Sequence, residues 1–409
     1  TLDDAKSVIA KIKNYYKQES LGNWRNVVTF IGDDGDYNTH MSQAENLANS
    51  VNKTYPAFFA DKIYFDAYKQ LSTSGGEKYP DVTAAINSRV KQGTLVMNYT
   101  GHANEKSLAD EGVLNIGIIN TWSNFNRLPI FVTATSAGEA ILFNPPGGGV
   151  GLFSTTRLVY SGANFVLNNK FFQYIFEKDE QGNNLRLGDV MQKAKAAANT
   201  GTNQLNFTLL ADPAMRLANP NYQVKTTSID GKNVGTEVDT MRTLSVVTVK
   251  GYVADNKGAK LTSFNGEIIP TVYDKAFQVE TLGNAGETPM GYTVQNNIIY
   301  KGLASVKNGE FEFSFFVPKD ISYKVDKGKI LYYAYNETVD AQGYFDGFYV
   351  GGSSNNTIAD SNGPDVELFL NSDTFKDGEE VSASSVLIAN ISDATGINTS
   401  GTGIGHDIT

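Results

Sequence analysis

The residues best suited to chemistry in this sequence lie where predicted strands end. The run LVMNYTGHA is an apolar strand that delivers Gly101, His102 and Ala103 at its carboxyl end. In open α/β sheets, catalytic and binding groups gather beyond the carboxyl ends of the strands. A histidine placed there can act as a general base, which needs a nucleophile within hydrogen-bond reach. The alternative meaning of His102 is a hydrogen-bonded structural residue.

A second strand end lies at the junction of Thr135 and Ser136. The β-branched run PIFVTAT ends at Thr135, and a helix is predicted to start at once, because Ser136 and Glu139 have capping-box spacing. Strand-to-helix connections usually take about 2–6 residues, and none is left here. Ser136 is the candidate nucleophile at this junction. We interpret it instead as a helix cap, since no G-x-S-x-G pattern surrounds it.

The sequence gives weaker signals for metal or nucleotide binding. The turn GDDGD brings Asp33, Asp34 and Asp36 to another strand end, where carboxylates suit a structural calcium ion, although such turns often bind nothing. The chain has no cysteine and three histidines, which are His40, His102 and His406. Zinc is therefore not expected, and no other cofactor is required. The GGGVG run at 147–151 lacks the P-loop Lys and Ser/Thr, which argues against nucleotide binding.

Composition indicates a folded, multidomain protein. The 409 residues are 41% hydrophobic and 19% charged, and the net charge of −10 with no Lys/Arg cluster argues against a nucleic-acid partner. No run approaches the roughly 18 apolar residues of a membrane helix. No signal peptide is recognisable, and because the chain opens directly on a helical pattern, Thr1 is not expected to be a native start.

The first part of the chain alternates helices with strands. Helices are predicted at Leu2–Lys17, Met41–Val51, Asp81–Gln92, Lys170–Glu177 and Gly188–Ala198. Strands are predicted at Asn26–Gly32, Lys62–Tyr68, Thr94–Thr100, Pro129–Thr135 and Val150–Thr155. This alternation is typical of an α/β domain with a mostly parallel sheet, covering residues 1–220.

After Pro220 the pattern changes to alternating strands separated by turn signals. Runs such as LSVVTVKGYV, NGEFEFSFFVP and KILYYAYN predict a β-sandwich domain, of the Ig-like kind, over residues 221–350. A Ser/Asn/Gly-rich break follows, so residues 351–409 are predicted to be a linker and the start of a further, truncated β domain.

Several runs of this sequence resemble the gingipain family of cysteine peptidases. They are NYTGH, PIFVTAT, SAGEAILFNPPGGGVGLFSTTRLVYS and FTLLADPAMRL, supported by GDDGDYNTHMSQAE, KIYFDAY and GINTSGTGIGHDIT. They occur in the family's order over nearly the whole chain. The resemblance implies a caspase-like α/β peptidase domain whose catalysis depends on a Cys-His dyad.

The resemblance also assigns residues. The family's histidine falls on His102, with Gly101 before it allowing close approach, and its cysteine would directly follow Thr135. The family's next residue, a glycine whose N–H helps to form the oxyanion hole, is Ala103 here, which keeps the N–H but tightens the steric limits. Glu105 is near enough in sequence to orient His102, although an exposed loop carboxylate is its commoner meaning.

The missing cysteine has two interpretations. Either the native protein carries a loop of roughly ten residues between Thr135 and Ser136 that is absent from these 409 residues, or the loop is deleted and the protein is non-catalytic. We favour the absent loop, because a direct connection would strain the passage from strand to helix.

Within the family, the resemblance is to the C-terminal signal peptidase, or sortase, of type IX secretion. It implies a protein on the outer face of the bacterial outer membrane that removes the C-terminal signal domain of secreted cargo and transfers the cargo to anionic lipopolysaccharide. The implied partners are the outer-membrane β-barrel PorV, with PorQ and PorZ. The alternatives are a secreted gingipain-like endopeptidase and an inactive scaffold or adhesin on the same fold.

Overall fold

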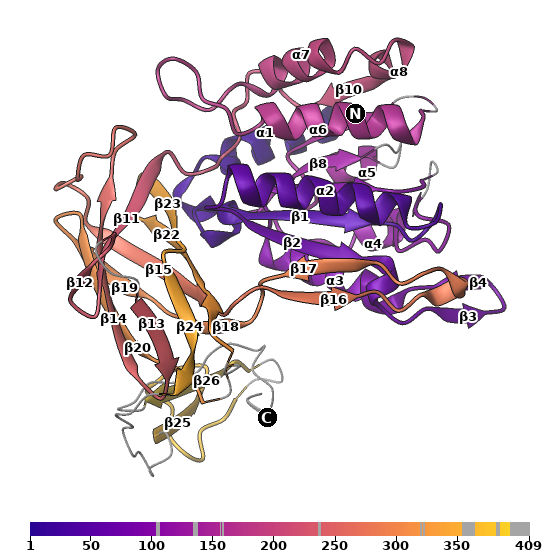
Figure 1. The fold of residues 1–409 in the computed structure, drawn as a ribbon. Helices are drawn as coiled ribbons and strands as arrows, with labels where there is room; N and C mark the ends of the chain where they lie inside the picture. Colours follow the sequence, from indigo (N-terminus) through magenta and orange to yellow (C-terminus); the bar gives the residue numbers. More distant parts are fainter. Residues whose placement is uncertain are drawn as a thin grey trace.

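The protein has an α/β half and a β half. The computed structural model describes residues 1–103, 107–133, 138–155, 157, 159–235, 239–319, 321, 324–353, 365–381 and 385–392. In Figure 1 the first half, from indigo to magenta, forms a sheet covered by helices, and the orange and yellow second half consists mainly of strands.

The α/β half is built on a six-stranded sheet with the order β10-β9-β8-β5-β1-β2. Its strands are β1 (Val27–Gly32), β2 (Phe59–Tyr64), β5 (Val96–Thr100), β8 (Ile130–Thr133), β9 (Gly151–Thr155) and β10 (Phe207–Leu210). All neighbouring pairs are parallel except β9 and β10. The prediction of a mostly parallel sheet is therefore confirmed.

Helices cover both faces of this sheet. They are α1 (Leu2–Tyr15), α2 (Thr39–Thr54), α3 (Pro80–Gln92), α4 (Ile116–Ile119), α5 (Gly138–Phe143), α6 (Ser161–Tyr174), α7 (Leu187–Ala198) and α8 (Thr202–Leu205). One apolar cluster packs α2, α6 and α7 on one face, and a second packs α3, α4 and α5 on the other, where α1 contacts α5. Burial on both faces explains why the strands are nearly continuous apolar runs.

Two predicted elements are displaced along the chain, and helix α2 ends three residues later than the predicted Val51. Helix α6 begins at Ser161 and ends at Tyr174, whereas the sequence predicts Lys170–Glu177, because asparagines of low helix propensity interrupt its apolar periodicity. Strand β2 begins at Phe59 and ends at Tyr64, and a 3₁₀ turn, η3 (Phe65–Ala67), follows it. The predicted strand at Lys62–Tyr68 therefore begins three residues after β2 begins and ends four residues after β2 ends.

Short elements complete this half. They are η1 (Gln18–Ser20), η2 (Asn23–Asn26), β3 (Leu71–Thr73), β4 (Gly76–Lys78), β6 (Ser107–Leu108) and β7 (Leu114–Asn115). The hairpins β3–β4 and β6–β7 are two-stranded. Neither extends the main sheet.

In the β half, a main sheet closes on itself. Its strands are β11 (Tyr222–Ile229), β12 (Lys232–Asn233), β14 (Val246–Ala254), β15 (Gly266–Tyr273), β18 (Ile298–Lys301), β19 (Ala304–Lys307), β20 (Glu310–Phe316), β22 (Lys329–Tyr335) and β23 (Asp340–Phe345). Because β11 pairs with both β14 and β23, the order β11-β14-β20-β19-β15-β22-β23 forms a ring around its own apolar core. The predicted β character is confirmed, and the Ig-like arrangement stays a prediction.

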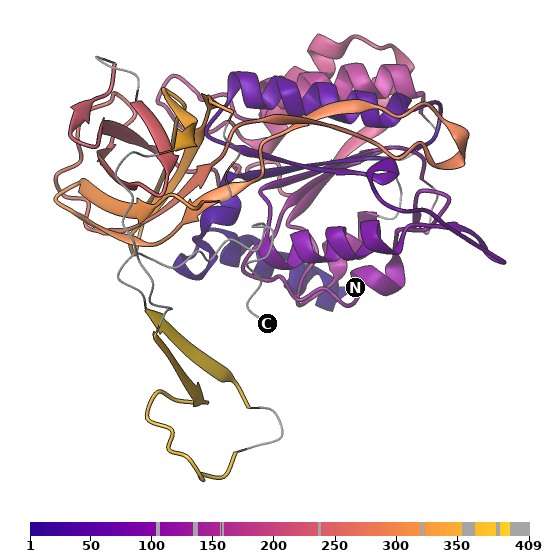
Figure 2. The same cartoon turned by 60° about the horizontal axis from the view of Figure 1, so that its bottom comes forward.

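Three further groups of strands accompany the ring. They are β13 (Asp239–Thr243), β21 (Asp326–Lys327) and β24 (Phe348–Ser353), the hairpin β16 (Phe277–Glu280) and β17 (Gly291–Val294) with η4 (Asn284–Gly286) at its tip, and the hairpin β25 (Asp365–Leu370) and β26 (Leu387–Ser392). The β25–β26 hairpin projects from the rest of the molecule (Figure 2). Among the described residues, no helix has the length and apolarity needed to span a membrane.

The β16–β17 hairpin lies alongside the α/β half, next to β2 (Figure 1). Its tip surrounds the buried Asp66, whose carboxylate accepts the backbone N–H groups of Gly283 at 2.8 Å and Asn284 at 2.7 Å. Farther on, the carbonyl of Thr288 accepts a hydrogen bond of 2.7 Å from Asn38. The β half therefore contacts the loop that follows β1.

A buried ion pair also joins the halves. Arg25 in η2 donates to Asp340 in β23 at 2.8 Å, and both side chains are less than 10% exposed. The Tyr333 hydroxyl donates to the same carboxylate oxygen at 2.9 Å and accepts the N–H of Gly22 at 2.8 Å. The two charges therefore keep hydrogen-bond partners on both sides of the contact.

Replacing one member of this pair is expected to cost far more than replacing an exposed pair. Asp340→Asn leaves the Arg25 charge buried without a counter-ion, so we expect a loss of about 3–5 kcal/mol in the free energy of unfolding. Glu312→Gln, which breaks the exposed pair with Lys250, is the control and is expected to cost less than about 1 kcal/mol. Urea denaturation of both variants checks this, and equal losses would contradict it.

Candidate active site

The candidate site forms where β1 and β5 end side by side. The two strands are parallel, with Gly32 paired to Thr100, so the loops that follow them leave the same edge of the sheet. The N–H of Asp33 donates to the carbonyl of Thr100 at 3.0 Å, which fixes the two loops together. Asp33 and His102 are brought into contact by this register.

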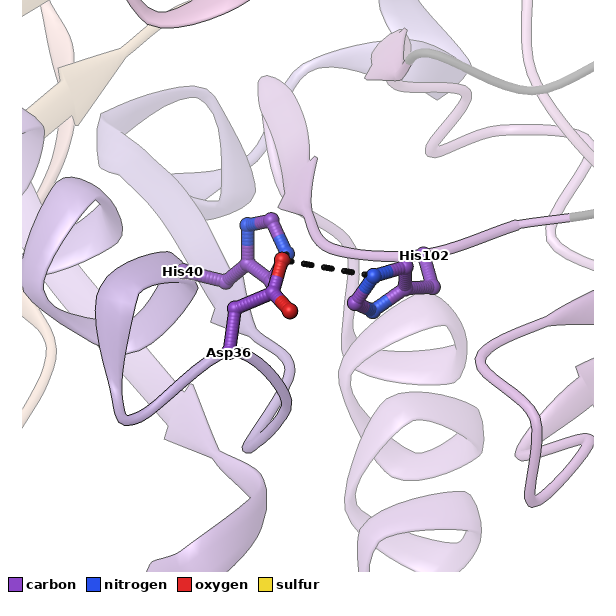
Figure 3. Close-up of side chains that lie close together, drawn as sticks. All are labelled: Asp36, His40 and His102. Carbon is purple, nitrogen blue, oxygen red and sulfur yellow. Dashed lines mark ion pairs between the residues drawn. The ribbon is translucent and has the colours of Figure 1, made fainter. Parts of the chain in front are cut away.

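His102 lies between two carboxylates. Its Nδ1 is 3.2 Å from Oδ2 of Asp33, and its Nε2 is 3.4 Å from Oδ2 of Asp36. The ring is 45% exposed, whereas Asp33 is buried. His40 contributes a third group, with its ring perpendicular to that of His102 at a centroid distance of 4.8 Å (Figure 3). An imidazole with a carboxylate beside each ring nitrogen has a defined orientation.

The carboxylate of Asp33 is the most constrained group in the site. Its Oδ2 accepts the backbone N–H of His102 at 2.8 Å and lies 3.4 Å from the hydroxyl of Tyr99. Burial raises the pKa of the Asp33 carboxyl to about 6, although the His102 N–H lowers it in part and the neighbouring Asp34 raises it further. At neutral pH the ionised form dominates, and it can orient His102.

Two glycines permit this close packing. A Cβ atom on Gly101 would lie 2.3 Å from Cβ of Asp33, and one on Gly35 would lie 2.9 Å from Nδ1 of His102. Gly101 therefore allows the two loops to approach, and its supporting role in catalysis stays a prediction. Gly35 has the same role on the opposite loop.

The acidic turn after β1 does not act as one group. Asp33 and Asp34 lie near Glu111, with carboxylate oxygens of the three within 4.8 Å of one another, while Asp36 faces the histidines. Burial raises the pKa of Glu111 to about 7. Calcium binding by Asp33, Asp34 and Asp36 stays a prediction, and their separation means that Glu111 would have to supply a ligand in place of Asp36.

On the other side of β5 lies β8, the strand from which a nucleophile is expected. Asn98 of β5 pairs with Val132 of β8, so Thr133 ends β8 at the same edge of the sheet. Helix α5 begins at Gly138. The predicted cysteine position after Thr135, the helix cap Ser136 and the carboxylate Glu105 all lie outside the described residues.

Two further residues lie next to His102 in sequence or against the helix that follows β8. Ala103 pairs with Leu108 through an isolated β-bridge, and its role in the oxyanion hole stays a prediction. Lys11 of α1 is fully buried and donates to the carbonyl of Leu142 in α5 at 2.8 Å. A cationic donor at the carboxyl end of a helix stabilises it, so Lys11 fixes the helix that follows β8.

Sequence reasoning singled out His102, Gly101 and the aspartates, and it missed how they combine. It gave no role to Tyr99 or Glu111, and it considered His40 only as an unsuitable zinc ligand. The strand prediction itself contains a usable signal, because the carboxyl ends of neighbouring parallel strands lie at the same edge of the sheet. That rule connects GDDGD with NYTGH, but it requires knowledge that β1 and β5 are adjacent.

The family assignment follows from the match of residues 1–218 to the model of peptidase family C25. The chain belongs to this family. The resemblance to the gingipains seen in its motifs is therefore confirmed. No curated protein sequence matches the chain.

The chain also has similarity to several solved structures. The chain is 31% identical to the dimeric latent PorU from Porphyromonas gingivalis, with 64% of this chain and 25% of PorU covered and a TM-score of 0.39. Identity to the Arg-specific cysteine proteinase gingipain R is 15%, with 86% of this chain and 73% of that chain covered and a TM-score of 0.45. Identity to the complex of P. gingivalis RgpB pro- and mature domains is 13%, with 84% of this chain and 74% of that chain covered and a TM-score of 0.45. The chain thus spans a quarter of the length of PorU.

The raised pKa of Asp33 predicts a specific pH dependence of stability. The folded value of about 6 lies above the ordinary value of 3.8, so the folded protein binds this proton more tightly. The resulting stabilisation is complete below pH 3.8 and is lost as the pH rises through about 6. The free energy of unfolding of the wild type, relative to Asp33→Asn, is expected to fall between about pH 4 and pH 7. Denaturant titrations over this range check it, and a constant difference would contradict it.

Proposed function

We propose that this protein is a cysteine peptidase in which His102 is the general base and Asp33 positions it. The observation that carries the proposal is the contact of 3.2 Å between Nδ1 of His102 and the buried Oδ2 of Asp33. An ionised Asp33 favours the tautomer with the proton on Nδ1, so that Nε2, which lies 3.4 Å from Oδ2 of Asp36, carries the lone pair that accepts a proton from a nucleophile. Membership of a peptidase family supports the same role.

The proposed reaction is acyl transfer. Nε2 of His102 takes the proton of a thiol, and the thiolate attacks a peptide carbonyl to form a tetrahedral intermediate. Backbone N–H groups, including that of Ala103, stabilise the oxyanion. His102 then gives the proton to the departing amine, and a thioester remains. Water or an amine attacks the thioester, which releases the product and restores the thiol.

The proposed mechanism needs a thiol, and none of the 409 residues is a cysteine. We propose that it belongs to a loop between Thr135 and Ser136. The position is supported by the sheet order, since β8 is the strand adjacent to β5 and ends at the edge that carries His102. The rival interpretation, an inactive scaffold or adhesin, requires that Thr135 and Ser136 be bonded directly in the native protein.

For the substrate, we propose the C-terminal signal domain of type IX secretion cargo, with transfer of the cleaved cargo to anionic lipopolysaccharide. The support is the resemblance to PorU in the motifs and the 31% identity to it. The proposed setting is the outer surface of the outer membrane, with PorV, PorQ and PorZ as partners. A secreted gingipain-like endopeptidase is the competing assignment, and it would cleave proteins that carry no such domain.

The existence of the nucleophile is tested by peptide mapping. Mass spectrometry of the purified full-length protein should find additional residues, among them a cysteine, in the region from Arg127 to Arg157. Alkylation of that cysteine should abolish cleavage of a cargo protein that carries a C-terminal signal domain. A peptide in which Thr135 is bonded directly to Ser136 would exclude the Cys-His mechanism and favour the scaffold.

The position of His102 is tested by adding a methyl group beside its ring. Gly35→Ala places a Cβ atom 2.9 Å from Nδ1 of His102, so the ring must move and cleavage is expected to slow about 10- to 100-fold. His102→Ala removes the base and is expected to cost about 100- to 10,000-fold.

The control for Gly35→Ala is Gly162→Ala in α6, where an added Cβ atom meets nothing within 4 Å. Its cleavage rate should equal that of the wild type. Circular dichroism of all three variants shows whether they fold. A folded Gly35→Ala protein with the wild-type rate would contradict the assignment of His102.

A further inference from the structure

Three side chains at the edge of the candidate site converge on one point. Asp36 and His40 approach from the loop after β1 and the first turn of α2, and His102 approaches from the loop after β5 (Figure 3). We propose that Asp36, His40 and His102 bind a zinc ion, and that the bound ion inhibits the peptidase by occupying its general base. The inhibitory part rests on the proposed function, whereas the binding site does not.

The distances between the ligand atoms suit tetrahedral coordination. Nε2 of His40 and Nε2 of His102 each lie 3.4 Å from Oδ2 of Asp36. Zinc bonds of about 2.0–2.1 Å at tetrahedral angles require ligand atoms about 3.3–3.4 Å apart. One ligand atom from each of the three residues lies within 4.8 Å of the other two, so the three can approach one ion together.

His40 is the independent sign of a ligand. Its side chain is only 6% exposed, and within the described residues neither of its ring nitrogens has a hydrogen-bond partner, the nearest group being the Asp36 carboxylate at 3.4 Å from Nε2. A buried polar group without a partner costs free energy, so its retention needs a reason. Its Nε2 is directed at Asp36, and a metal ion between these atoms would supply the missing partner.

The surroundings of His102 support the same site. Its Nδ1 contacts the buried carboxylate of Asp33 while Nε2 faces Asp36. A metal-bound histidine typically donates its other ring N–H to a carboxylate, which fixes the tautomer and raises the basicity of the ligand nitrogen. The group that would prepare His102 as a base would therefore also prepare it as a ligand.

The donor set selects the ion. Two imidazoles and one carboxylate match zinc and related transition metals, whereas calcium prefers six to eight oxygen ligands. Three protein ligands leave a fourth tetrahedral position for water. Once Nε2 of His102 is bonded to zinc, its lone pair is unable to accept the proton of a nucleophile. Binding and general-base catalysis thus compete for one nitrogen atom.

Direct binding tests the site without any activity measurement. The full-length protein, stripped of metal, is titrated with zinc in competition with a zinc-sensitive dye, and cobalt is used to read coordination from its visible absorption. We expect one zinc ion and a tetrahedral cobalt spectrum. Residues that only hydrogen-bond to a metal ligand already contribute about 10- to 100-fold to affinity, so Asp36→Asn and His40→Gln, which change a ligand itself, should each weaken binding at least about 100-fold.

His406→Gln is the matched control, since it removes the remaining histidine and should leave the affinity unchanged. If His40→Gln fails to fold, Asp36→Asn decides, because Asp36 is 59% exposed. An absence of zinc binding overturns the proposal. Equal affinity in the wild type, Asp36→Asn and His40→Gln also overturns it, because the zinc would then be bound elsewhere.

The inhibitory part is tested by cleavage of cargo at rising zinc concentrations. The rate should fall at the zinc concentration that fills the site, and a chelator should restore it. Zinc binding that leaves the rate unchanged would overturn the inhibitory part. A protein that binds zinc as described but never cleaves cargo would retain the site, and the proposed function alone would fail.

Discussion

One buried oxygen atom, Oδ2 of Asp33, holds the candidate site together. It accepts the backbone N–H of His102, contacts the ring of the same residue and lies near the hydroxyl of Tyr99. These groups come from β5 and the loops that follow β1 and β5, and Gly101 and Gly35 leave room for their approach. The parallel pairing of β1 and β5 places this oxygen, so the chemistry at the edge depends on a register set in the core.

The sequence predicts the sheet that carries this site better than the contacts between the residues of the site. Apolar runs separated by amphipathic helices suffice to predict a mostly parallel sheet, because strands buried on both faces have that composition. His102 is recognisable because it ends such a run. Its partners are not, because Asp33 lies 69 residues earlier and becomes a neighbour only through the order of the strands. Helix α6 shows the same limit, since packing against the sheet outweighs its unfavourable asparagines.

The role of His40 could not be predicted because its meaning depends on burial. In sequence it is one of three scattered histidines, and without cysteines zinc is disfavoured. In the fold its ring reaches the edge of the site, where burial and the neighbouring His102 lower its pKa. A lowered pKa favours the neutral imidazole, which is the form that coordinates metals. The positions of two loops, rather than any local motif, create this property.

The β16–β17 hairpin affects how such proteins can be divided. The family match ends at residue 218, yet the backbone that satisfies the buried carboxylate of Asp66 comes from residues 283 and 284, and Asn38 bonds to residue 288. A fragment cut at the end of the match would therefore leave Asp66 without these partners and release one support of the loop that carries Asp36. A chimaera would have to exchange the hairpin together with the sheet it lies against. In this chain, the unit that carries the candidate site is larger than the segment by which the family is recognised.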